Sequence, residues 1–221
     1  MAFMYEIRHV WKVEEGACSS LFFLTQPSIL RGTTVVLVER PYLRETDIWL
    51  RLRTAEKPIR VDSSRCDQLL LGTDFTYNDL RFWLPTDDFN VDSIGFKSSP
   101  EVQECILNIR RKHTGIGSSR MRLTLDATHW LPLTIEWLEP ERDDPLRIYS
   151  AQSLVCCDGI WTPRVISVSR PRESYLSVMT LRRALHRIPV ESSLLRAENL
   201  VRLDKSTFNE WIPFAHQFVQ S

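Results

Sequence analysis

Alternation of hydrophobic and polar residues, the pattern typical of β-strands, recurs along most of the chain. Residues 47–53 show it clearly, because Ile48, Leu50 and Leu52 occupy every second position between polar or amphipathic residues. Short turn sequences such as Asp158-Gly159 separate the strand-like segments. Strands are therefore predicted over residues 5–13, 21–25, 33–39, 47–53, 104–111, 119–125, 133–139, 146–156, 162–169 and 175–183.

Few segments carry the signals of a helix. Thr76 is expected to begin one, because its hydroxyl can cap the first turn and Asp79 lies where a carboxylate reaches back to the cap amide. This short helix is predicted over residues 77–83, before Pro85. Two further helices are predicted, one from Ser192 or Ser193 toward Leu200 and one over the C-terminal residues 206–221.

Successive strands joined by short turns favour an antiparallel meander that curls into a barrel or half-barrel. The fold class expected is therefore mainly β, with one strongly curved antiparallel sheet and a few short helices. We see no linker, internal repeat or low-complexity segment, so residues 1–221 are assigned to a single domain.

Composition and charge exclude several classes of function. Hydrophobic residues make up 43% and charged residues 25%, which is typical of a globular chain. Lys plus Arg and Asp plus Glu are both 28, and this balance argues against nucleic-acid binding. No apolar run reaches membrane-spanning length, and the first twenty residues have no signal-peptide core. We therefore expect a cytoplasmic protein, or a periplasmic one if a signal peptide has been removed.

The residues that usually hold metals and cofactors lack the required spacing. The five cysteines include no CxxC pair, and the five histidines form no HxxH pattern, so we expect thiols, no disulfide and no metal. No GxSxG, P-loop or GxGxxG sequence is present, so no nucleotide or dinucleotide cofactor is expected. Any chemistry would then be cofactor-free.

Several motifs together resemble those of the LolA-like family of bacterial outer-membrane lipoprotein-sorting proteins. The most specific match is Leu71-Gly72-Thr73-Asp74-Phe75-Thr76-Tyr77-Asn78-Asp79-Leu80, and the resemblance extends loosely over most of residues 20–205. The other matching motifs are Gln26-Pro27, Leu30-Arg31-Gly32-Thr33, Asp47-Ile48-Trp49-Leu50, Ile59-Arg60, Leu123-Thr124-Leu125-Asp126, Trp130-Leu131-Pro132-Leu133, Gly159-Ile160-Trp161-Thr162-Pro163 and Met179-Thr180.

This resemblance implies a half-barrel with helices across its concave face and a cavity that shields a hydrophobic ligand. The implied partner is a lipid, or the acyl chain of a lipoprotein. Two alternatives stay open. One is a cytoplasmic, cofactor-free enzyme that acts on a hydrophobic biosynthetic intermediate in the same cavity. The other is an interaction module that uses a sheet edge or an apolar patch.

Candidate site residues lie in and near the best-matching motif. If the protein is an enzyme, the acid–base candidates are Asp74, Tyr77 and Asp79, which fall within six residues of one another. A structural role is the alternative, in which Asp74 accepts hydrogen bonds from turn amides and Asp79 completes a helix cap. The candidate ligand-binding residues are aromatic, and they are Trp49, Phe75, Tyr77 and Trp83.

Overall fold

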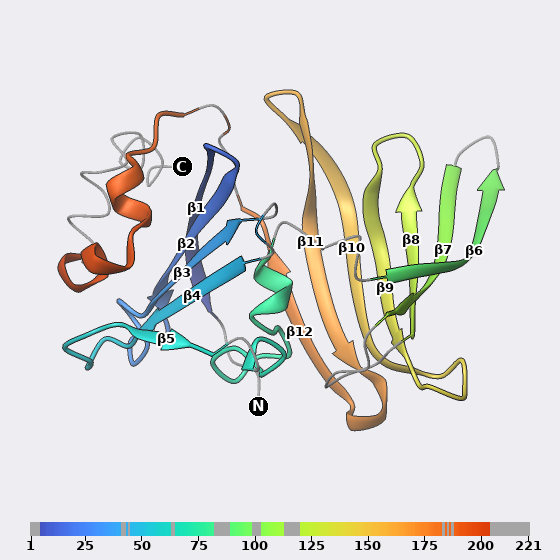
Figure 1. Ribbon diagram of the computed structural model, residues 1–221, viewed down its shortest axis with the longest axis horizontal. Helices are drawn as coiled ribbons and strands as arrows, with labels where there is room; N and C mark the ends of the chain where they lie inside the picture. The colour runs from blue at the N-terminus through green and yellow to red at the C-terminus, as the bar shows by residue number, and fades with distance from the viewer. Residues whose placement is uncertain are drawn as a thin grey trace. The chain divides into compact units, whose positions relative to one another are not determined.

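The computed structural model describes residues 5–40, 43, 45–62, 65–81, 89–98, 103–112, 120–182, 184, 186 and 188–203. The chain divides into two compact units (Figure 1). The first unit comprises residues 1–66, 81–84 and 189–221, and the second comprises residues 67–80 and 85–188. Whether the whole chain acts as one domain stays a prediction.

The first unit contains a five-stranded antiparallel sheet with the strand order β1-β2-β3-β4-β5. Its central strands carry the most hydrophobic runs of the chain, Leu21–Leu24 and Val35–Val38, and nearly all of these side chains are buried. A strand that is apolar on successive residues needs cover on both faces. The strands are β1 (Glu6–Glu14), β2 (Ala17–Gln26), β3 (Thr34–Arg40), β4 (Glu45–Arg51) and β5 (Ile59–Val61).

Two short 3-10 helices near the C-terminus contribute to the core of the first unit. η6 (Ser192–Leu195) contacts β2, and η7 (Ala197–Arg202) contacts β4. Their leucines are buried, as is the leucine that follows η7, and they supply one layer of cover for the sheet. These buried residues are Leu194, Leu195, Leu200 and Leu203.

The second unit contains a seven-stranded antiparallel sheet with the strand order β12-β11-β10-β9-β8-β7-β6. Neighbouring strands are consecutive in the sequence, as expected for a meander. The strands are β6 (Phe89–Ser98), β7 (Gln103–Arg111), β8 (Arg120–Asp126), β9 (Leu131–Leu138), β10 (Pro145–Cys157), β11 (Ile160–Arg170) and β12 (Tyr175–Thr180), with the 3-10 helix η5 (Pro171–Glu173) between the last two.

The mainly β, antiparallel class is confirmed, but the expectation of one strongly curved sheet is wrong. The described strands form two open sheets, each with two edge strands, and neither closes on itself. The strand prediction also missed β5 and β6. β6 was missed because a bulge between Val91 and Ser93 interrupts its alternation, and most of its side chains are exposed.

The helical predictions are only partly correct. Within 77–83 the described helix is a single 3-10 turn, η3 (Asn78–Leu80). The helix predicted from Ser192 toward Leu200 is instead the pair η6 and η7, which an extended residue, Arg196, separates. The predicted helix over residues 206–221 lies outside the described residues.

Candidate functional site

The segment from Leu69 to Leu80 forms a compact turn in the second unit. The Leu70 amide donates to the Phe75 carbonyl at 2.7 Å, and Gly72 has a φ of +80°, which favours glycine. The predicted cap of η3 is present. The Thr76 amide donates to the Asp79 carboxylate at 2.6 Å, and the Asp79 amide lies 3.3 Å from the Thr76 hydroxyl.

Asp74 is a buried carboxylate that ties this segment to the sheet. Its Oδ1 accepts from Arg170 Nε at 3.0 Å, and its Oδ2 accepts from the Ser177 hydroxyl at 2.7 Å. Arg170 ends β11 and Ser177 lies on β12, so Asp74 bridges two strands. The expectation that this carboxylate accepts from turn amides is therefore wrong, and the Thr73 hydroxyl accepts from the Phe75 amide instead.

Asp79 makes a second anchor, at β10. Its side chain is only 5% exposed and forms an ion pair with Arg147, whose guanidinium also lies 4.3 Å from the centre of the Trp137 ring. Burial, together with the nearby Asp79 charge, raises the pKa of Tyr149 to about 12. Asp79 therefore belongs to a buried cluster in which charge, ring and phenol lie together.

The structure places the aromatic candidates in different surroundings. Phe75 and Tyr77 lie beside the two anchoring carboxylates in the second unit, and both are buried. Trp49 is half-buried on β4 of the first unit, opposite Val36 and Arg60 on the neighbouring strands. Trp83 lies outside the described residues. Ligand contact by any of the four stays a proposal.

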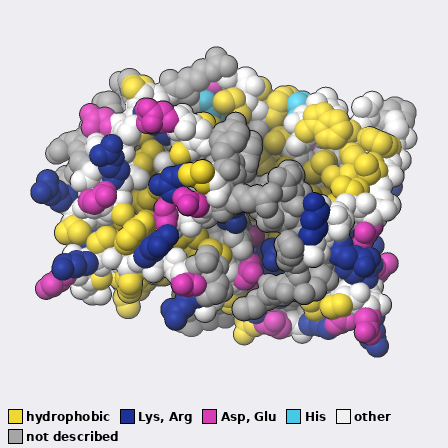
Figure 2. Space-filling model, viewed as in Figure 1, with side chains coloured by type: hydrophobic (Ala, Val, Ile, Leu, Met, Phe, Trp, Pro, Cys, Tyr) yellow, Lys and Arg dark blue, Asp and Glu magenta, His cyan; other side chains and the backbone are white. Residues whose placement is uncertain are grey.

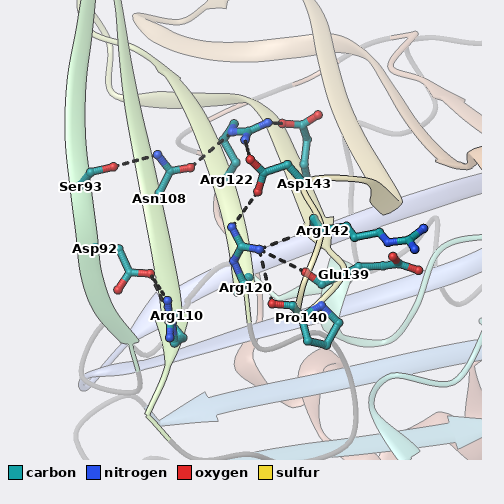
Figure 3. Close-up of polar contacts among 11 residues, drawn as sticks. Asp92, Ser93, Asn108, Arg110, Arg120, Arg122, Glu139, Pro140, Arg142 and Asp143 are labelled. Carbon is teal, nitrogen blue, oxygen red and sulfur yellow. Dashed lines mark hydrogen bonds and ion pairs between the residues drawn. The ribbon is translucent and has the colours of Figure 1, made fainter.

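One face of the seven-stranded sheet is polar. A row of directly paired residues crosses four strands (Figure 3): the Asn108 amide donates to Ser93 at 2.8 Å, and Arg122 donates to Asn108 at 3.3 Å. Arg122 also pairs with Glu136 at 3.2 Å. Ion pairs from Arg110 to Asp92 and from Arg120 to Asp143 extend the row. Satisfied polar groups of this kind suit a face in water.

The opposite face of the same sheet is apolar. Ile109, Met121 and Leu123 form its buried centre, and partly buried neighbours pack against them, namely Phe89, Leu107, Leu125, Ile135 and Trp137. Ile94 and Phe96 of β6 pair with Leu107 and Cys105, so they extend this face.

The β6 end of this apolar face is open to solvent. Ile94 and Phe96 are 60% and 71% exposed, and Val91, which pairs with Ile109, is also exposed. Figure 2 shows hydrophobic side chains gathered where Figure 1 draws β6 to β9. A row of exposed apolar side chains that continues a buried cluster is typical of a binding surface.

Sequence reasoning missed both the arginine partners and the apolar edge. Both arginines contact Asp74 from far along the chain: Arg147 is 73 residues away and Arg170 is 96 residues away. No local sequence pattern links positions so far apart. Val91, Ile94 and Phe96 follow a 3-then-2 spacing because of the bulge, which hides their common face. A strand prediction that allows one extra residue at a bulge would place these three side chains on one face.

Among the described residues, no helix is long and apolar enough to cross a membrane. The same residues include no group of three or more His, Cys, Asp or Glu side chains arranged for a metal ion.

Solved structures of other proteins resemble this chain. A putative outer membrane lipoprotein-sorting protein domain from Vibrio parahaemolyticus superposes with a TM-score of 0.80 at 16% identity, covering 90% of this chain and 84% of its own. A DUF1329 family protein from Desulfovibrio piger gives 0.79 at 18%, covering 89% and 83%. A LolA superfamily protein from Nitrosomonas europaea gives 0.57 at 18%, covering 85% and 82%.

Sequence comparison adds a family. No curated protein matches the chain, but a family model with the description "-like: Uncharacterized protein" matches residues 16–202. The LolA-like resemblance of the motifs is confirmed at the level of the fold. The chain therefore belongs to the family that this model describes, and it has the fold of the LolA superfamily.

Proposed function

We propose that this protein binds and shields a hydrophobic ligand, a lipid or the acyl chain of a lipoprotein, on the apolar face of the seven-stranded sheet. The observation that carries the proposal is the two-sided character of that sheet. Its polar face is internally hydrogen-bonded, whereas the apolar face continues from the buried Ile109 cluster to the exposed Ile94 and Phe96. The likeness to a lipoprotein-sorting domain supports the same conclusion.

The energetics of such binding need no charged anchor. Each methylene moved from water to an apolar surface contributes about 0.8 kcal/mol, so an acyl chain gains several kcal/mol along a few ångströms of sheet. The exposed edge formed by Val91, Ile94 and Phe96 lies along one strand, which suits an extended chain better than a compact molecule. Acyl chains are therefore the ligand class we favour.

Asp74 and Asp79 have structural roles in this proposal. Both oxygens of Asp74 accept hydrogen bonds, from Arg170 and Ser177, and Oδ2 of Asp79 accepts from Arg147 and Thr76. A general acid or base must instead reach a proton on the substrate. No contact among the described residues therefore supports the alternative of a cofactor-free enzyme.

A fluorescent fatty acid, cis-parinaric acid, tests the proposal. The wild-type protein should bind it saturably, and Phe96→Glu should weaken binding at least about tenfold, because the new carboxylate would have to lose water on contact with the chain. Val178→Glu is the matched control. Val178 is also an exposed apolar residue on an edge strand, β12, but it pairs with Ser167 and lies on the polar face.

The control must bind like the wild type while both variants keep the wild-type unfolding temperature. If Phe96→Glu also binds like the wild type, the apolar face is not the ligand site. If both variants weaken binding equally, the probe is responding to the overall charge of the protein, and the apolar face is again not the ligand site.

A further inference from the structure

A basic cavity of about 320 Å³ lies in the first unit, separate from the apolar face described above. Its walls include the four arginines Arg31, Arg51, Arg53 and Arg202, together with the apolar side chains of Phe23 and Leu203. None of the lining residues is acidic. Four arginines, each positively charged at any physiological pH, therefore line one small space.

The fold brings these arginines together from three places in the sequence. Arg31 lies in the turn before β3, Arg51 ends β4, and Arg202 ends η7. Arg51 and Phe23 both pair with Thr34, so their side chains share one face of the sheet. The cavity is thus built by packing η7 beside β4, and local sequence gives no sign of it.

The arginines in this cavity lack the partners that other arginines have. Arg40, Arg81 and Arg147 each lie against a carboxylate. Within the described part of the chain, none of the four cavity arginines forms an ion pair with Asp or Glu. Arg31 and Arg53 donate to backbone carbonyls, those of Thr25 at 3.2 Å and Ser28 at 3.3 Å. These bonds hold the side chains in place but leave their charge uncompensated.

Arg51 has an unsatisfied hydrogen-bond donor at this cavity. Its Nε is buried and has no hydrogen-bond partner in the structure. A buried donor without a partner is destabilising, and such donors are rare in folded proteins. An anion in the cavity would satisfy this donor and would also offset part of the positive charge of the four arginines.

We propose that this arginine cavity binds a phosphate group. Guanidinium groups match phosphate oxygens with paired, charge-assisted hydrogen bonds, and several converging arginines are the usual way to hold a phosphate. The phosphate belongs either to a phospholipid headgroup or to a small phosphorylated molecule, since both present the same oxygens. This site belongs to the first unit, so it does not depend on the proposed function of the second.

Calorimetric titration with inorganic phosphate, at constant ionic strength set with chloride, tests the site. The wild-type chain should bind phosphate, whereas Arg51→Gln and Arg202→Gln should each weaken binding at least about tenfold. Arg196→Gln is the control, because Arg196 is an exposed arginine of the same unit, between η6 and η7, and does not line the cavity.

The unfolding temperature without phosphate separates a binding role from a structural one. Arg51→Gln should not lower it, because the variant removes a donor that has no partner, and added phosphate should raise it for the wild type only. If Arg51→Gln does not fold, Arg202→Gln decides, since Arg202 is exposed on η7. Equal phosphate affinity in the wild type and both cavity variants, or no binding to the wild type, overturns the proposal.

The same titration identifies the source of the phosphate. Dihexanoyl phosphatidic acid, which is soluble as a monomer, is compared with inorganic phosphate. Tighter binding of the lipid that Arg51→Gln abolishes assigns a phospholipid headgroup. Equal affinity for the two probes assigns a small phosphorylated molecule. Lipid binding that neither Arg51→Gln nor Arg202→Gln changes contradicts the site.

Discussion

The ion pair between Asp79 and Arg147 offers the sharpest test of how the motif segment is held to the seven-stranded sheet. We predict that Asp79→Asn destabilises the protein by about 3 kcal/mol, since removing one partner of a buried pair costs about 3–5 kcal/mol. The Asp79 and Arg147 side chains are 5% and 15% exposed, so water can do little to replace the lost charge. The lower end applies because an asparagine oxygen can still accept from the Thr76 amide.

Thermal unfolding followed by circular dichroism measures this loss. For a chain of this size each kcal/mol shifts the unfolding temperature by about 2–4 °C, so we expect a decrease of about 6–12 °C. Asp92→Asn is the matched control. Asp92 pairs with Arg110 on the polar face, where both side chains are largely exposed, and such a pair contributes about 1 kcal/mol or less.

A double-mutant cycle then assigns the loss to the pair. Arg147→Met keeps a long side chain over the Trp137 ring but removes the charge. If the pair is buried as described, the second substitution should cost little once the first has been made. A loss below about 1 kcal/mol for Asp79→Asn, or strictly additive single losses, would refute this reasoning.

Three further predictions concern stability, ionisation and thiol reactivity. Thr76→Ala should cost about 1 kcal/mol in chemical denaturation through the lost cap, whereas Thr76→Ser should cost much less; equal losses would contradict the cap. The pKa of Tyr149 is raised to about 12, so the contribution of its neutral phenol to stability is complete below pH about 10 and is lost as the pH rises toward 12. The free energy of unfolding, measured across that range, should therefore fall in the wild type, and Tyr149→Phe should abolish this part of the pH dependence. The exposed Cys156 should react with a thiol reagent in the native protein far faster than the buried Cys18 and Cys105, and uniform rates would contradict the described burial.

Much of the fold could be predicted from the sequence because strands of a meander pair with their neighbours in the chain. Segments such as β4 and β9 have apolar residues at every second position, which was enough to predict them as strands. The separation into two sheets could not be predicted in this way. It depends on which strand β6 pairs with, and its exposed side chains and bulge carry no such information.

The candidate site was predicted unevenly for the same physical reason. The cap joins Thr76 and Asp79, which are only three positions apart, so the sequence alone predicts it correctly. The partners of Asp74 lie 96 and 103 residues away, on strands that meet it only after folding. The lack of a partner for Arg51 Nε likewise becomes visible only when the neighbours of this atom in space are known.

Photo-crosslinking with a diazirine-bearing fatty acid tests the central claim, that the apolar face of the seven-stranded sheet binds an acyl chain, most directly. Mass spectrometry of the cross-linked peptides should place the label on apolar-face residues of β6 and β7, namely Ile94, Phe96 and Leu107, and unlabelled palmitate should compete it away. Cross-links on the polar-face residues Asn108 and Glu136, or labelling that palmitate does not reduce, would contradict the account.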